Sequence, residues 1–149
     1  MNNANRVALD TFASALSGQA MDNASEYTFL VSKDLLLTLA TEVSDSIGLY
    51  CTVYRADSTI ANDIKEEILL ANYGCAGTNG ATLGIYGEDN SVMLTQLIPC
   101  ANHIPENRLL EIGLAFIRTC ITWHERLNNI KTLSSNSTYN EPFGSFLKI

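Results

Sequence analysis

Apolar residues recur every three or four positions in three stretches of the chain, which is the spacing of an amphipathic helix. The first stretch covers residues 4–17, the second runs from residue 60 or 61 to residue 73, and the third runs from residue 105 to about residue 130. Pro105 suits a helix start, because the first turn does not use the N–H that proline lacks. The third stretch carries two adjacent apolar rows, so we expect it to lie across a sheet or a partner.

Between these stretches the chain contains short apolar or alternating runs, which are typical of β-strands. We predict strands over residues 27–31, 35–43, 47–56, 81–86 and 91–98. The polar breaks between consecutive strands have the length of hairpin loops, so these neighbours should be antiparallel. The expected fold class is therefore α+β, in the order α-β-β-β-α-β-β-α, with a twisted antiparallel sheet packed by helices.

Several predicted strands carry large apolar side chains on both faces. Leu35, Leu37 and Leu39 should point one way, and Leu36 and Ala40 the other. A small antiparallel sheet needs only one apolar face. The second apolar face is covered either by this chain's own helices or by another protein chain, since each large side chain left exposed forfeits roughly 1.5–3 kcal/mol.

Length and composition fit one globular domain. The chain has 149 residues, of which 46% are apolar, and we assign residues 1–131 to one domain. Residues 132–149 form a Ser/Asn-rich tail, whose polar half we expect to be mobile. No apolar run approaches the ~18 residues of a membrane span.

Acidic residues exceed basic ones, and this narrows the classes of partner. Sixteen Asp and Glu against nine Lys and Arg give a net charge of −7. An acidic chain does not bind nucleic acid or an anionic membrane through simple charge, because both require a basic face. The excess contributes to solubility, and it would also suit a basic partner.

Candidate catalytic and metal-binding groups are few. Cys51, Cys75, Cys100 and Cys120 lack the paired spacing of zinc ligands, so we expect neither a metal nor a cofactor. Polar residues interrupt any apolar leader near the N-terminus, which predicts a cytoplasmic protein with reduced thiols. We interpret His103 and His124 as structural, and an enzyme or small-ligand protein using Cys75, His103 or His124 is the weaker alternative.

Several segments of the sequence, and the order in which they occur, resemble the class I chaperones of bacterial type III secretion, the Tir-chaperone-like group. The resemblance covers about residues 6–130. It rests on Glu67-Ile68-Leu69-Leu70-Ala71-Asn72-Tyr73, Gly80-Ala81-Thr82-Leu83-Gly84-Ile85-Tyr86, Asp89-Asn90-Ser91-Val92-Met93-Leu94, Leu109-Leu110, Phe116 and Trp123-His124-Glu125-Arg126-Leu127.

This resemblance implies a cytosolic homodimer without enzymatic activity or bound nucleotide. Such a chaperone holds the N-terminal region of one or more effector proteins in an extended, secretion-competent form. The resemblance implies a dimer interface at Ile64, Ile68, Leu69 and Asn72. It implies effector contacts at Leu9, Phe12, Leu16, Phe29, Leu36 and Tyr50. For each of these residues the alternative is burial in the core, and for the whole chain it is a non-secretory α+β adaptor that binds another protein.

Overall fold

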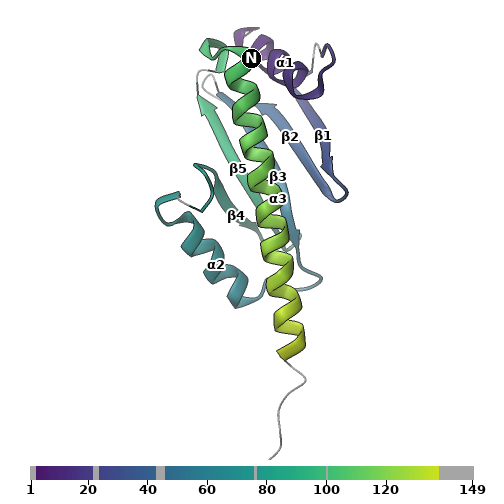
Figure 1. Cartoon of the computed structure of the whole chain (residues 1–149), viewed down its shortest axis with the longest axis vertical. Helices are drawn as coiled ribbons and strands as arrows, with labels where there is room; N and C mark the ends of the chain where they lie inside the picture. The colour runs from purple at the N-terminus through teal and green to yellow at the C-terminus, as the bar shows by residue number, and fades with distance from the viewer. Residues whose placement is uncertain (1–2, 22–23, 43–45, 76, 100, 138–149) are drawn as a thin grey trace, which may run out of the picture.

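The computed structural model describes residues 3–21, 24–42, 46–75, 77–99 and 101–137, and it confirms the predicted order of elements (Figure 1). The elements are α1 (Asn3–Ser17), β1 (Glu26–Ser32), β2 (Leu35–Thr41), β3 (Ser46–Arg55), α2 (Asn62–Asn72), β4 (Thr82–Tyr86), β5 (Ser91–Pro99) and α3 (Glu106–Ser137), with short 3₁₀ turns at Tyr73–Cys75 and Ala101–His103.

The strands form one antiparallel sheet in the order β1-β2-β3-β5-β4. The first three strands are a meander, as their short polar connections predict. The chain then passes through α2 to β4 at the far edge, and β5 returns between β4 and β3. The sheet therefore has two end strands, β1 and β4, that come from opposite halves of the sequence.

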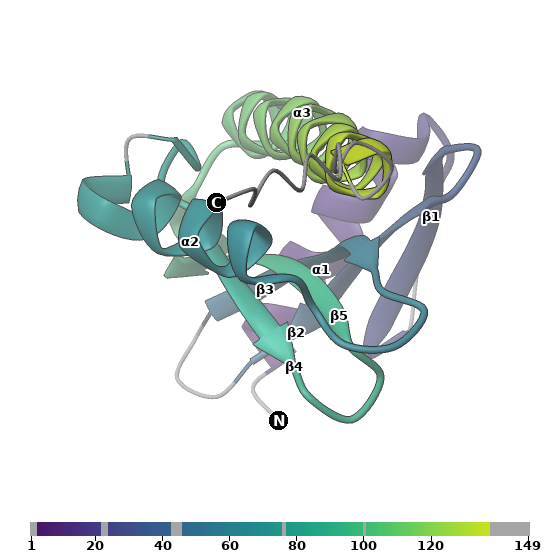
Figure 2. The same cartoon turned by 90° about the horizontal axis from the view of Figure 1, so that it is seen from below.

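One face of the sheet is covered by helices, and the other, which we call the open face, has no cover from the described segments. On the covered face β2 places Leu35, Leu37 and Leu39, each at most 1% exposed, whereas Leu36 on the opposite face is 54% exposed. Figure 2 shows α3 lying across the sheet and α2 beside β4. The predicted alternation of β2 is thus confirmed, and the cover for its second face does not come from the helices that the structure describes.

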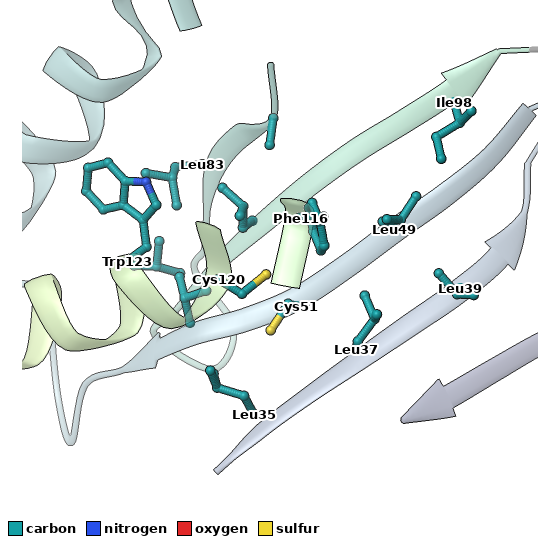
Figure 3. Packing of buried hydrophobic residues seen from close by; sticks show 14 of the residues in the cluster. Leu35, Leu37, Leu39, Leu49, Cys51, Leu83, Ile98, Phe116, Cys120 and Trp123 are labelled. Carbon is teal, nitrogen blue, oxygen red and sulfur yellow. The ribbon is translucent and has the colours of Figure 1, made fainter. Parts of the chain in front are cut away.

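The core lies between the covered face and α3 (Figure 3). Phe116, Cys120 and Trp123 of α3 are buried against strand residues such as Cys51 and Leu37. The Trp123 indole donates a hydrogen bond of 2.9 Å to the carbonyl of Gly77, so the polar atom of this large side chain is satisfied. Trp123 therefore anchors the loop after α2 to the long helix.

Close approach of α1 and α3 depends on a glycine in α3. A Cβ atom added at Gly113 would lie 2.8 Å from carbon atoms of both Phe12 and Leu16. Phe12 is fully buried at this crossing and Leu16 is half-buried beside it. The two helices thus form a seam, the α1–α3 seam, in which one helix backbone receives the side chains of the other.

A β-bulge changes the predicted alternation at the end of β3. The pairing with β5 shifts by one residue between Thr52 and Tyr54. Both Val53 and Tyr54 are consequently buried, although simple alternation places Tyr54 with Thr52 on the open face. Nδ1 of His124 lies 2.9 Å from the Val53 carbonyl oxygen and donates to it, so this histidine supports the bulge.

The last helix is longer than its hydrophobic pattern predicts. The apolar rows end near Ile130, but the backbone of α3 continues to Ser137. The rest of the predicted tail, residues 138–149, lies outside the described residues. The predicted boundary at residue 131 therefore does not coincide with the end of the helix.

Candidate protein-binding surfaces

A groove opens where the end of α1 meets β1. It has a volume of about 330 Å³, and Leu16, Phe29, Val31 and Ile117 contribute its apolar lining. Phe29 and Val31 belong to the end strand β1, and both are half-buried against the core. We call this the α1–β1 groove. It offers partly exposed apolar side chains directly beside a sheet edge.

A second groove, of about 540 Å³, extends from the open face of the sheet to His124 and Asn128 of α3, and we call it the sheet-face groove. Leu36, Tyr50 and Met93 supply apolar surface there, from β2, β3 and β5 respectively. Thr28 and Thr38 lie beside them, and their hydroxyl oxygens are 3.2 Å apart. The groove therefore combines large apolar side chains with hydroxyl groups that can bond to a main chain.

The phenol of Tyr50 is held in place at this groove. Tyr50 lies over Gly48, where an added Cβ atom would collide with the tyrosine ring. Its hydroxyl donates a hydrogen bond to the Glu42 carboxylate. Burial, and then the hydrogen bond and negative charge of Glu42, raise the pKa of Tyr50 to about 12, so the phenol stays protonated and neutral at physiological pH.

The outer surface of α2 is a third exposed apolar region. Leu69, Leu70 and Tyr73 are 72%, 65% and 87% exposed, and we call them the α2 surface. Leu69 and Tyr73 are four residues apart and thus lie on one side of the helix. Water would have to solvate this cluster in a single copy, so it is a candidate for contact with another chain.

The structure separates the six predicted effector contacts into four that line a groove and two that are buried in the core. Leu16 and Phe29 line the α1–β1 groove, and Leu36 and Tyr50 line the sheet-face groove. Leu9 and Phe12 are fully buried in the core. These two residues therefore offer no surface to an effector in this conformation, because α3 and the sheet already cover them.

The predicted dimer contacts separate in the same way. Leu69 is exposed, whereas Ile64 and Ile68 are buried in the core of the chain. The Asn72 side chain turns to β4, where its amide bonds both main-chain polar groups of Leu83. Among these four residues, a second copy would find apolar surface at Leu69.

Sequence reasoning missed Val31, Ile117 and Met93 in the grooves and Leu70 and Tyr73 on the α2 surface. The spacing of Glu66, Leu69, Leu70 and Tyr73 follows a second helical stripe beside the buried one, and this signal could have indicated the α2 surface. The lining of the grooves depends on how far α3 covers the sheet, which no local pattern encodes.

The groups that might support catalysis do not assemble into a site within the described chain. His103 precedes α3, and His124 lies five turns after Glu106, the first residue of that helix, which is roughly 27 Å along the helix axis at 1.5 Å per residue. The adjacent Cys51 thiol, and then burial, hold the pKa of the Cys120 thiol well above its usual range. The side chain of Cys75 and the whole of Cys100 lie outside the described part.

Two further searches of the described residues gave negative results. No group of three or more His, Cys, Asp or Glu side chains in these segments is arranged to hold a metal ion. None of the helices found in the same segments is long and apolar enough to cross a membrane.

Solved structures show the same fold at low sequence identity. A chain of the ExsC–ExsE complex has a TM-score of 0.68 and 14% identity, covering 85% of this chain and 97% of its own. A chain of the HopA1–SchA chaperone–effector complex has a TM-score of 0.63 and 17% identity, covering 84% and 98%. A chain of the heterodimeric ExoU–SpcU complex, from the type III secretion system of Pseudomonas aeruginosa, has a TM-score of 0.59 and 12% identity, covering 80% and 93%.

The sequence itself identifies the family. No curated protein matches it significantly. The sequence profile of the Tir chaperone protein (CesT) family, however, matches residues 8–124, which is well over half of the chain and spans α1 to the middle of α3. The chain belongs to the Tir chaperone protein (CesT) family.

Proposed function

We propose that this protein is a type III secretion chaperone that binds a segment of an effector in extended form and keeps it soluble without hydrolysing ATP. Membership of the Tir chaperone family supports this function, and similar folds occur in complexes described as chaperone–effector and type III secretion assemblies. The observation that carries the proposal is the apolar α1–β1 groove beside the end strand β1. The proposal assigns no catalytic role to any residue, and it places the protein in the cytoplasm.

An extended client strand can pair with the outer edge of β1, which no other strand of the described residues occupies. The Thr41 N–H donates to the Ser25 carbonyl, so the main-chain groups of Ser25 and of every second residue after it face β2. The main-chain N–H and C=O groups of Glu26, Thr28 and Leu30 therefore point to the outer edge. Their N–H and C=O groups provide hydrogen bonds that do not depend on client sequence. Side chains at alternate client positions then reach Phe29 and Val31 in the groove and confer specificity.

The α2 surface provides the second part of the proposal, a homodimer. Leu69, Leu70 and Tyr73 are apolar and exposed in one copy, and burying them against a second copy would recover roughly 1.5–3 kcal/mol for each large side chain. The two client-binding grooves lie on other elements, so a dimer would keep both available.

Charge supports the same partner class. Two copies would carry about twice the net charge of −7, which keeps a protein with exposed apolar grooves soluble. The lining of the sheet-face groove includes one acidic and one basic residue, Asp34 and Arg55, so the attraction comes from the net charge of the whole chain. A client segment rich in basic and apolar residues would therefore be attracted over distance and held by contact.

The experiment begins with a client found by affinity purification from a bacterium that carries a type III secretion system. The N-terminal segment of that client is then titrated against the purified chaperone by calorimetry. We expect Val31→Asp to weaken binding about tenfold or more, because the charge would be desolvated in the groove. Leu97→Asp is the matched control, since Leu97 is exposed and lies outside both grooves.

Three results would contradict the proposal. The first is recovery of a client that is never secreted, which would favour an adaptor of the same fold. The second is equal binding by the Val31→Asp and Leu97→Asp variants, which would remove the α1–β1 groove from the site. The third is a client segment that stays folded when bound, as shown by its amide protection.

A further inference from the structure

The two end strands of the sheet differ in what lies against their outer edges. An uncovered edge presents a row of N–H and C=O groups to which any extended chain can add. β1 is an end strand beside β2, and β4 is an end strand beside β5. A chaperone that takes a client as an added strand therefore has two candidate edges, and the structure distinguishes them.

At the β4 edge, the Asn72 side chain takes the place of a neighbouring strand. Its Nδ2 donates to the Leu83 carbonyl at 2.8 Å, and its Oδ1 accepts from the Leu83 N–H at 2.9 Å. A side-chain amide carries an accepting oxygen and a donating NH2 group on the same carbon atom, so one Asn side chain can bond both the N–H and the C=O of a single strand residue. Leu83 therefore makes on its outer side the pair of bonds that a sixth strand would have provided.

Thr78 bonds the main-chain N–H and C=O of Ala81, the outward-facing residue two positions before Leu83, in a similar way. The Ala81 N–H donates to the Thr78 carbonyl at 3.0 Å, and the Thr78 hydroxyl donates to the Ala81 carbonyl at 2.5 Å. Thr78 is fully buried, so this contact is built into the loop after α2. Positions 81 and 83 are successive on one edge because outward groups recur every second residue.

Packing of α2 holds the Asn72 side chain against the β4 edge. Asn72 is the last residue of α2, and the helix lies beside β4 (Figures 1 and 2). Ile68 and Ala71, close to it on the same helix, are buried in the core. The end of α2 thus cannot move away from β4 without exposing apolar surface. Ile85 is the next outward position of β4, and one open position is too short a run for a stable added strand.

We propose that Asn72 and Thr78 close the β4 edge, so that an extended polypeptide adds to the sheet only at β1. The consequence for a client rests on the proposed function: each chaperone chain accepts one client strand, at the edge of β1. The closure itself is independent of any client, because it equally prevents two copies from pairing through β4. Asn72 is thus a residue that determines which edge is used, and it need not contact the client.

The first test measures amide hydrogen exchange in the full chain by NMR. Asn72→Leu removes both side-chain bonds at similar size, and we expect the Leu83 amide to exchange about tenfold or more faster. The amides of Thr82 and Gly84 face β5 and should keep their protection. Asn62→Leu, the same substitution at the exposed start of α2, is the control and should leave Leu83 unchanged. Unchanged exchange at Leu83 in Asn72→Leu would overturn the proposal.

The second test asks whether the opened edge accepts a chain. We expect Asn72→Leu to form a species of about twice the wild-type mass in sedimentation, through edge-to-edge pairing, while Asn62→Leu keeps the wild-type mass. A fall in mass would place Asn72 in a contact between copies and would overturn the assignment, as would an unchanged mass together with faster Leu83 exchange. Thr78→Val, which removes one bond of the edge, should show a smaller shift and serves if Asn72→Leu does not fold.

The third test uses the N-terminal segment of the identified client, carrying a nitroxide label. In the wild-type chain the label should broaden amide signals of β1 and leave those of β4 sharp, and in Asn72→Leu it should broaden both. Broadening at β4 in the wild-type chain would overturn the proposal. A segment that fails to bind would instead contradict the proposed function, while the first two tests would still decide the closure.

Discussion

The α1–α3 seam and the α2 surface contain the same kind of residue in opposite situations. Leu9 and Phe12 of α1 are fully buried, whereas Leu69 and Leu70 of α2 are mostly exposed. All four belong to apolar helical stripes, so periodicity alone does not distinguish them. The difference lies in whether the rest of the chain supplies a cover: α3 and the sheet cover α1, and the described chain leaves the outside of α2 uncovered. The first stripe thus contributes to folding, and the second is available for association.

The largest expected effect comes from removing a side chain of the seam. Phe12→Ala should lower the free energy of unfolding by about 3–5 kcal/mol, because Phe12 is fully buried beside Gly113 and the cavity would not collapse fully. Urea denaturation followed by circular dichroism measures this change. Leu97→Ala, at a position that is 60% exposed, should stay within about 0.5 kcal/mol of the wild type. Equal effects of the two variants would contradict the packing of the seam.

An intermediate effect, on association, is expected at the α2 surface. Leu69→Asp should raise the dissociation constant of the dimer about a hundredfold, since a partner would have to bury an unpaired charge. Light scattering would then report a mass near 16.3 kDa for the variant and twice that for the wild type. The fold should persist, because Leu69 is already exposed in one copy.

Leu97→Asp is the control for this experiment, with the same change on the open face of the sheet. It should remain dimeric at the same concentrations. A wild-type chain that is monomeric at micromolar concentration would remove the α2 surface from consideration as a dimer interface.

The smallest expected effect concerns the pH dependence set by Tyr50. Its pKa is raised to about 12 in the folded chain, against ~10 in an unfolded one. The stabilisation from the neutral phenol is therefore fully present below pH ~10 and is lost as the pH rises towards 12. Urea denaturation between pH 9 and pH 11.5 should show the wild type losing its advantage over Tyr50→Phe, since phenylalanine has no proton to release.

Tyr73→Phe is the matched substitution on the α2 surface, where the side chain is exposed. Its pH dependence of unfolding is the reference for a tyrosine-to-phenylalanine change away from Glu42. If Tyr50→Phe shows the same pH dependence, the bond to Glu42 does not act on stability.

Most of the fold could be predicted from local patterns. The alternation of Leu35 to Leu39 and the short polar breaks determine strands, faces and antiparallel neighbours, and each of these predictions is confirmed. The bulge at Val53 could not be predicted, because the residues around it alternate normally and the shift arises from pairing with a strand about 40 residues later. The helix continues to Ser137 because no proline or glycine stands between Ile130 and Ser137.

The candidate surfaces were less predictable than the fold. Leu9, Phe12 and Leu16 share one stripe of α1, yet Leu9 and Phe12 are fully buried, and of the three only Leu16, which also packs against Gly113 of α3, lines a groove. Only the family resemblance predicts a dimer contact at Asn72. Its main-chain partner Leu83 lies eleven residues away, and a side chain that completes a sheet edge leaves no periodic signal. Such tertiary contacts decide which apolar and polar groups remain available.

The bulge in β3 makes the length of that strand more critical than its composition. Deleting Val53 would restore an ordinary ladder in which Tyr54 stays opposite the buried Val92, but it would remove one of the two buried side chains of the bulge and leave His124 without its carbonyl acceptor. A residue gained or lost between Arg55 and Asn62, before α2 begins, would disturb none of these contacts. Related chains should therefore vary in length after β3 and keep a fixed count within it.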